Sequence, residues 1–175
     1  IAPILSFTAE EIYAALPGQD KSESIFFETW YEGLFELDAN VAFDRDYWVR
    51  IFAVKSAVNK VLEEARNEKL VKASLSTEAT LYVNDSIMAD LQQLGDELRF
   101  VLITSEAVLK PLSEAEGARE TELDGMKVAL KASAHVKCER CWHHREDVGA
   151  HADHPELCNR CVDNVYGVGE ARKFA

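Results

Sequence analysis

The sequence predicts an α+β fold with three parts: a helical segment, a small mixed α/β sheet, and a C-terminal knuckle or ribbon built on four cysteines. Three observations support this prediction. A helical period runs from Asp44 to about Leu70, short alternating segments follow it, and all four cysteines fall in two Cys-x-x-Cys pairs. We therefore expect three domains, at residues 1–75, 76–134 and 135–175.

The first 43 residues predict one helix and an extended linker. Thr8 and Glu11 have the spacing of a capping box, and Pro17-Gly18 would end the helix that follows. Residues 19–43 have no clean period, and we expect this linker to pack its aromatic rings on helices because large rings usually supply core area. These rings belong to Phe26, Phe27, Trp30, Tyr31 and Phe35.

The longest predicted element is the helix from Asp44 to about Leu70. Asp44 and Asp46 would lie in its first turn, where negative charge suits the helix dipole. The residues expected on its buried face follow spacings of three and four: Trp48, Ile51, Phe52, Val58, Val61, Leu62 and Ala65. Cations gather in its second half, among them Lys55, Lys60 and Arg66, and pairing with neighbouring glutamates would explain them as a solvated face.

The middle of the chain alternates as strands do. Strands are expected at residues 79–83, 98–103, 106–112 and 126–132. Asn84 can cap a helix over residues 87–94 that Gly95 ends. Residues 113–124 are acidic and predict a surface loop, and residues 167–175 predict a mobile, mildly basic tail.

The strongest motif is the pair Cys138-Glu-Arg-Cys141 and Cys158-Asn-Arg-Cys161, with sixteen residues between the two turns. This spacing is typical of a zinc site in which four thiolates fill the tetrahedral shell, so the ion would be structural. Iron is an alternative, because paired Cys-x-x-Cys turns hold iron too. Two disulfides or a redox pair fit less well, since four cysteines in 175 residues are too few for a disulfide-built fold.

Side chains around the cysteines suggest binding. Arg140 and Trp142 flank the first turn, and Arg160 lies in the second. A metal-stapled turn that presents an arginine and a tryptophan can stack on unpaired bases and hydrogen-bond to them. Equally, Trp142 could cover the metal as a core residue, and the arginines could offset the excess negative charge of four thiolates.

Composition limits the function further. The net charge is −12, which argues against purely electrostatic binding to nucleic acid, but residues 131–175 carry no net charge and contain all five histidines. No apolar run approaches the roughly 20 residues of a membrane helix and no secretory leader is present, so we expect a cytoplasmic protein without a membrane partner. The chain opens on Ile1 rather than Met, which suggests a fragment, and none of the common catalytic motifs occurs in it.

Several segments resemble the bacterial isoleucyl-tRNA synthetases, a family of class I aminoacyl-tRNA synthetases. The resemblance spans the chain and rests on its cysteine turns, on Glu146-Asp-Val-Gly149, on Gly169-Glu-Ala-Arg-Lys-Phe-Ala175, and on upstream segments. The upstream segments are Pro3–Ile12, Trp30–Leu34, Val58–Arg66 and Leu94–Leu102.

The resemblance implies that residues 1–75 end a helical anticodon-binding domain, residues 76–134 form a junction domain, and residues 135–175 form a zinc-binding end that touches the anticodon loop. It assigns contacts with isoleucine tRNA to Arg140 and Trp142, with further contacts from Arg160, Lys55, Lys60 and Arg66. It also implies a monomer, with ATP bound only by a catalytic domain of the synthetase chain that these residues lack.

Two other functions remain open from sequence. A DNA-repair zinc finger would use the same cysteine turns, although a basic chain would be expected. A purely structural zinc module for protein contacts would unfold at this end without zinc and would never bind tRNA.

Overall fold

The computed structural model describes residues 1–18, 20–34, 36 and 41–174. The chain divides into two compact units, Ile1–Val41 and Ala42–Ala175. Among the described residues, no helix combines the length and the apolar character that crossing a membrane requires.

The first unit contains helix α1 (Ser6–Ala15) and the short 3₁₀ turn η1 (Ile25–Phe27). The Lys21 ammonium closes the end of α1, because it donates to the carbonyl oxygens of Tyr13, Ala14 and Leu16 at 2.8–2.9 Å. The predicted Thr8 capping box is wrong. The backbone turn of the first residues starts the helix at Ser6, so Thr8 lies inside α1 and no side chain caps it.

The aromatic linker also differs from the prediction. Phe26, Phe27, Trp30 and Tyr31 are 56–80% exposed. Phe35 lies outside the described residues. Only Ala9 and Tyr13 of α1 are buried, so a single helix offers too little apolar surface to cover these rings.

Helix α2 (Arg45–Asn67) confirms the longest predicted element. The Asp44 side chain caps it by accepting from the Tyr47 amide at 2.7 Å. Its buried face comprises Tyr47, Ile51, Val54, Ala57, Val58, Val61, Leu62 and Ala65. Phe52, predicted on this face, is 55% exposed because it lies one position off the stripe that repeats every three or four residues.

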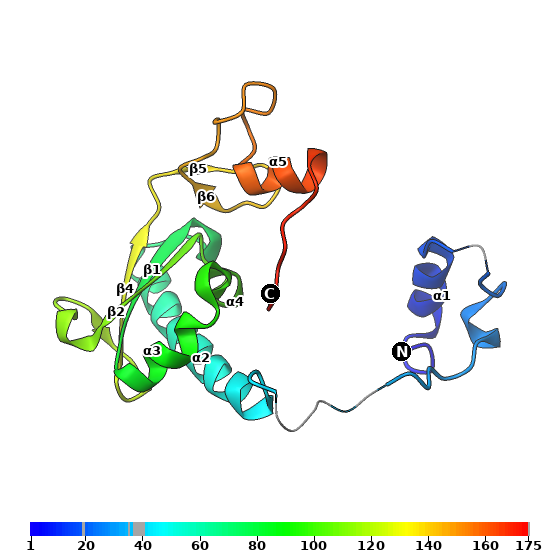
Figure 1. Ribbon diagram of the computed structural model, residues 1–175, viewed down its shortest axis with the longest axis horizontal. Helices are drawn as coiled ribbons and strands as arrows, with labels where there is room; N and C mark the ends of the chain where they lie inside the picture. Colours follow the sequence, from blue (N-terminus) through cyan, green and yellow to red (C-terminus); the bar gives the residue numbers. More distant parts are fainter. Residues whose placement is uncertain (19, 35, 37–40, 175) are drawn as a thin grey trace. The chain divides into compact units, whose positions relative to one another are not determined.

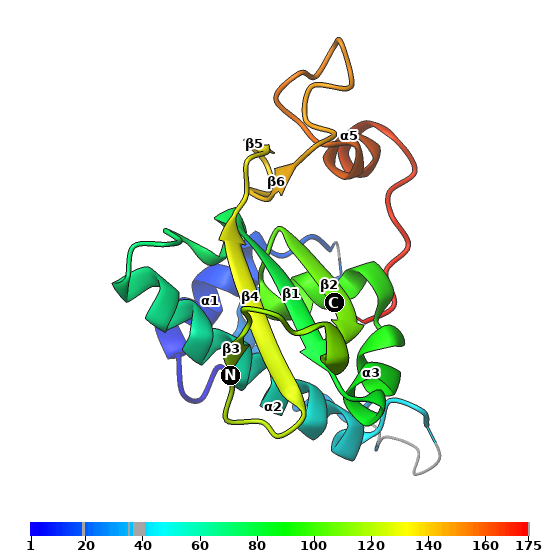
Figure 2. The same ribbon diagram turned by 90° about the vertical axis from the view of Figure 1, so that its left-hand side faces the viewer.

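A four-stranded sheet in the order β2-β1-β4-β3 forms the other layer. Its strands are β1 (Thr77–Val83), β2 (Glu106–Pro111), β3 (Arg119–Glu120) and β4 (Met126–Ala132). The central strand β1 pairs in parallel with β2 and antiparallel with β4. Figure 2 shows the sheet in front of α2 and α3, and the side chains between these layers form one apolar core.

The predicted strand over residues 98–103 is wrong, because this segment is helix α4 (Leu98–Leu102). Strands β1 and β2 are parallel, so the chain between them must cross over, and it does so through helical segments. These are α3 (Asp85–Gln92), capped by Asn84 as predicted, the turn η3 (Gly95–Glu97) and α4. The short turn η4 (Leu112–Glu114) follows β2 in the predicted surface loop.

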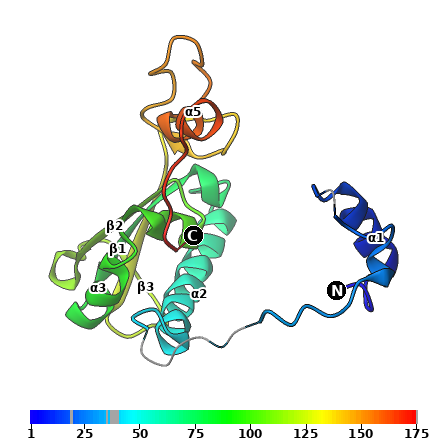
Figure 3. The same ribbon diagram turned by 45° about the vertical axis from the view of Figure 1, so that its right-hand side comes forward.

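The C-terminal residues form a smaller cluster around the cysteines (Figure 1). Strands β5 (Val136–Lys137) and β6 (His144–Arg145) form a two-stranded ribbon, and helix α5 (Asn159–Tyr166) follows it. We call residues 136–166 the zinc module. Residues 167–174 do not form the expected free tail, because Phe174 packs its ring on Phe43 at 4.4 Å between centroids. Figure 3 shows this segment, in red, returning from α5 toward the helical layer.

Truncation of a buried side chain on α2 tests the packing of the core. Leu62 is 1% exposed, so we expect Leu62→Ala to lower the free energy of unfolding by about 2–5 kcal/mol through lost burial and the cavity left behind. Val49→Ala, on the exposed side of the same helix, should change it by about 0.5 kcal/mol or less. Urea denaturation of both variants measures the difference, and equal effects would contradict the packing described for α2.

Candidate metal centre and nucleic-acid interface

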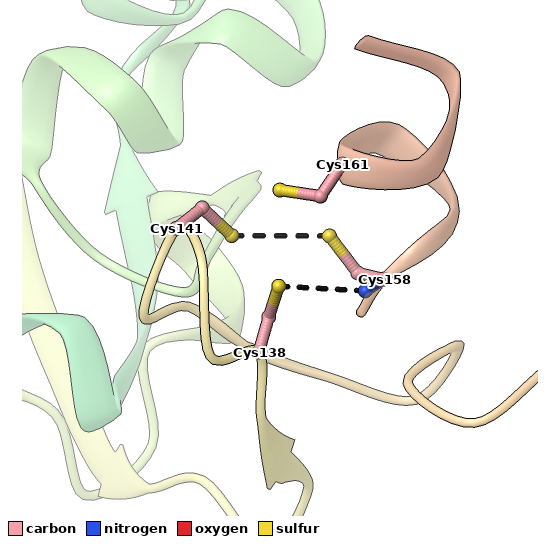
Figure 4. Close-up of side chains that lie close together, drawn as sticks. All are labelled: Cys138, Cys141, Cys158 and Cys161. Atoms are coloured by element: carbon pink, nitrogen blue, oxygen red, sulfur yellow. Dashed lines mark hydrogen bonds between the residues drawn. The ribbon is translucent and has the colours of Figure 1, made fainter. Parts of the chain in front are cut away.

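The four cysteines converge on one point (Figure 4). Cys138 and Cys141 lie on the turn between β5 and β6, Cys158 caps the start of α5, and Cys161 lies in its first turn. All four sulfur atoms lie within 4.8 Å of one another. Three of these residues are buried and Cys141 is half-buried, so the sulfurs face each other rather than solvent.

The spacing of the sulfurs fits a tetrahedral zinc ion. Zinc–sulfur bonds of about 2.3 Å place neighbouring sulfurs of a tetrahedron roughly 3.8 Å apart. The Cys141 and Cys158 sulfurs are 3.8 Å apart. A disulfide needs about 2.05 Å, so the geometry is that of metal ligands and not of a bridged pair.

The ionisation of the thiols also favours a bound metal ion. The hydrogen bond between the two sulfurs lowers the pKa of Cys141 and raises the pKa of Cys158. Neighbouring thiols therefore cannot all ionise by themselves. A divalent cation removes this conflict because it binds thiolates and stabilises their negative charge.

Hydrogen bonds from outside the four ligands orient the sulfurs. The Arg140 guanidinium donates to the Cys161 sulfur at 3.5 Å, and the Cys158 amide donates to the Cys138 sulfur at 3.4 Å. Arg140 therefore offsets thiolate charge, which is one of the two roles considered for it from sequence. Its side chain also remains exposed to solvent, so it has access to a further partner.

Trp142 does not cover the metal. Its side chain is 60% exposed, and the Lys137 ammonium lies 6.0 Å from the ring centroid. Its backbone is in the left-handed region with φ of 66°, which is unusual for a bulky residue. Such strain is typical of functional positions, and here it turns an indole ring outward from the cysteine turn. We call residues 138–142 the knuckle.

The other predicted contact residues lie elsewhere. Arg160 is turned inward, where its Nε donates to both carboxylate oxygens of Glu170 at 2.7 Å. On α2, Lys60 pairs with Glu122, while Arg66 pairs with Glu63 and also donates to the Ser74 hydroxyl. Lys55 is half-exposed on the same helix. The structure thus brings Arg140 and Trp142 together with the cysteines and gives Arg160, Lys60 and Arg66 partners of their own.

Two residues beside the knuckle make contacts that the sequence did not predict. Lys137 lies near the exposed indole, and a cation directly before a Cys-x-x-Cys turn could have suggested it. His143 is 7% exposed and packs edge-on against Phe100 at 5.6 Å between ring centroids. No sequence signal links Phe100 to His143, because only the tertiary fold brings α4 to the zinc module.

Two protein-family models match the chain. The model described as a zinc finger found in FPG and IleRS matches residues 137–164, and the model described as an anticodon-binding domain of tRNA ligase matches residues 1–81. The first match covers all four clustered cysteines, so the cofactor of this site is a structural zinc ion.

Curated relatives match the chain along its whole length. It is 55% identical over 176 residues to the isoleucine–tRNA ligase of Pseudomonas paraeruginosa and 56% identical to that of Alcanivorax borkumensis. Each match covers 100% of this chain and 19% of the relative, so the chain spans about a fifth of the length of these proteins. With an anticodon-binding match, a zinc-finger match and this identity in one sequence, the chain belongs to the isoleucyl-tRNA synthetase family, as a segment from the C-terminal part of these proteins.

Proposed function

We propose that the chain binds the anticodon loop of an isoleucine tRNA through the knuckle. The observation that carries this proposal is the exposed indole of Trp142, held in a left-handed backbone conformation directly after a cysteine of the four-sulfur site. An exposed ring on a rigid turn is suited to stack on an unpaired base. The matches to an anticodon-binding domain and to isoleucine–tRNA ligases support tRNA as the nucleic acid.

Zinc has a structural role in this proposal. Four cysteines complete its shell, so no position is left for a reacting water, and the ion shapes the knuckle instead. Arg140 donates one hydrogen bond to Cys161 and directs its remaining donors to a base edge or a phosphate. Lys137 adds positive charge beside the indole.

The cations of α2 form a second, weaker set of proposed contacts. The ion pair of Lys60 with Glu122 is 53% and 71% exposed at its two side chains, and such surface pairs contribute only about 0–1 kcal/mol. A tRNA phosphate can therefore replace the carboxylate, and we assign the same kind of contact to Arg66 and Lys55. Arg160 would support the knuckle from within, since Glu170 already holds its guanidinium.

The net charge of −12 shapes how binding works. An acidic chain gains little from non-specific attraction to phosphates, so affinity must come from stacking and a few placed cations. This disfavours the DNA-repair finger, which depends on broad attraction to a duplex.

We propose that the three domains predicted from sequence also have different functions. Residues 1–75 and 135–175 would contact tRNA, and residues 76–134 would join them. Helix α2 packs on the sheet of the middle segment, so in this scheme the two share a core while the helix contributes the tRNA-facing cations.

The longer protein would be a monomeric, cytoplasmic isoleucine–tRNA ligase that uses ATP in a part outside these 175 residues. The first unit offers a surface that further helices could cover, because α1 and the linker line an apolar groove of about 770 Å³. Its walls include Ile12, Leu16, Phe26 and Trp30. Other helices of the same synthetase chain would cover this groove.

A binding titration tests the function. The zinc-loaded chain would be titrated with the isoleucine tRNA anticodon stem-loop and with the same stem-loop carrying a replaced anticodon, at about 50 and 200 mM salt. We expect the authentic loop to bind about fivefold to 150-fold more tightly, which corresponds to one base edge read by hydrogen bonds from Arg140, because stacking on Trp142 tolerates any base. This ratio should survive the higher salt.

Each other result has a definite meaning. Equal binding of both loops, or no binding, would contradict anticodon recognition and favour a structural zinc module. Tighter binding to a DNA duplex of matched length would favour the DNA-repair finger.

A further inference from the structure

The segment Gly167–Phe174 returns from the end of α5 to the layer that holds α2 and α4 (Figure 3). Its last described residues are fixed there, since the amides of Lys173 and Phe174 donate to the two carboxylate oxygens of Glu97 at 2.8 and 2.7 Å. The Phe174 ring rests on Phe43, just before α2. We call residues 167–174 the strap, because they connect the zinc module to the helical layer a second time.

Glu170 is the centre of the strap. Its carboxylate accepts from Arg160 at 2.7 Å, from Arg172 at 2.8 Å and from Asn164 at 3.0 Å, and its amide donates back to the Asn164 side chain. Burial opposes its ionisation, but these hydrogen bonds outweigh burial and lower its pKa to about 2. Glu170 is therefore charged at neutral pH and ties the strap to α5 next to the zinc ligand Cys161.

Phe100 of α4 lies beneath the same cluster. The guanidinium carbons of Arg160 and Arg172 lie 4.7 and 4.4 Å from its ring centroid, within cation–π distance. His143, two residues after Cys141, meets the ring edge-on. One aromatic ring of the helical layer thus contacts both halves of the zinc module and the strap.

A third attachment lies on the ribbon side. The Ser105 hydroxyl accepts from the His144 amide at 2.6 Å, and the Ser105 carbonyl accepts from Arg145 at 3.4 Å. The zinc module therefore contacts the α/β layer at β6, at Phe100 and through the strap, in addition to its covalent connection after β4.

We propose that Glu170 and Phe100 are positioning residues for tRNA recognition: they hold the knuckle at one orientation relative to α2, so that Trp142 and the cations of α2 meet the same tRNA together. This inference rests on the proposed function. Contacts on one rigid body reinforce each other, whereas contacts on independently moving parts each lose ordering entropy on binding.

The test uses Glu170→Gln, which keeps the side-chain size but removes the charge that holds two arginines. Zinc content should stay at one ion per chain, because no ligand changes. Hydrogen exchange should rise in the strap and α4. Affinity for the authentic stem-loop should fall about tenfold, because binding must then order a knuckle whose orientation is no longer fixed. Glu170→Asp, which retains the charge, should restore part of the affinity.

Two further variants make the result specific. Phe100→Leu keeps an apolar side chain but removes the aromatic face, and it should weaken binding in the same direction as Glu170→Gln. Glu156→Gln removes one negative charge from an exposed position of the same module, so it is the matched control and should leave both exchange and affinity unchanged.

Unchanged exchange and affinity in Glu170→Gln and Phe100→Leu would overturn the proposal. Faster exchange with unchanged affinity would overturn the positioning role, because the strap would then only stabilise the module. Failure of the unaltered chain to distinguish the two stem-loops would refute the proposed function and with it the positioning role, whereas the exchange data would still report whether the strap holds the module.

Discussion

Removing zinc should unfold the zinc module and leave the α/β layer folded. The module has strands of two residues each and a small apolar cluster in which cysteines are most of the buried members. Structural zinc supplies roughly 10–16 kcal/mol of apparent binding free energy at neutral pH, far more than such a cluster gains from burial. The core around α2 and β1 contains no zinc ligand, so it should keep its own stability.

Hydrogen exchange before and after chelation measures this effect. We expect protection to disappear over residues 136–166 and to persist over α2, β1 and β4. Cys161→Ser should reproduce the loss without a chelator, whereas Val165→Ala, at an exposed position of α5, should retain zinc and protection. Persistent protection of the module in the zinc-free chain would contradict a fold that depends on the metal.

Replacing Trp142 should separate the role of its ring from the role of its backbone. Trp142→Gly removes the strain of a non-glycine residue in the left-handed region, which should stabilise the fold by about 1–2 kcal/mol. It also raises the conformational entropy of the unfolded chain, which should destabilise the fold by about 0.5–1 kcal/mol. Stability should therefore stay close to its original value. Affinity for the anticodon stem-loop should nevertheless fall by about 1–3 kcal/mol, because the stacking surface is lost.

The matched variant is Trp142→Phe, which keeps a stacking ring in the strained conformation. It should retain more affinity than Trp142→Gly although it is no more stable, and zinc content should be equal in both. If Trp142→Gly binds the stem-loop as tightly as the unaltered chain, the knuckle does not stack on the anticodon, and its exposed indole has another role.

Local patterns predicted the elements whose signals are local. The α2 helix could be located from its period and the acidic residues at its start, and the α3 start from Asn84, since these signals depend on neighbouring residues only. The segment over residues 98–103 could not, because a short apolar run is compatible with strand or helix. Only the parallel pairing of β1 with β2 required the crossover in which this run became α4.

The sequence by itself determined the ligand set and indicated the family: two Cys-x-x-Cys turns specify four thiolates, a set that suits zinc and also holds iron. Only the tertiary structure decided what the neighbouring side chains do. In the folded chain Trp142 is exposed and Arg160 forms an ion pair with Glu170. The tail predicted to be mobile packs against Glu97 and Phe43. The physical reason is that ligand spacing is a local property, whereas exposure and ion pairing depend on residues distant in the chain.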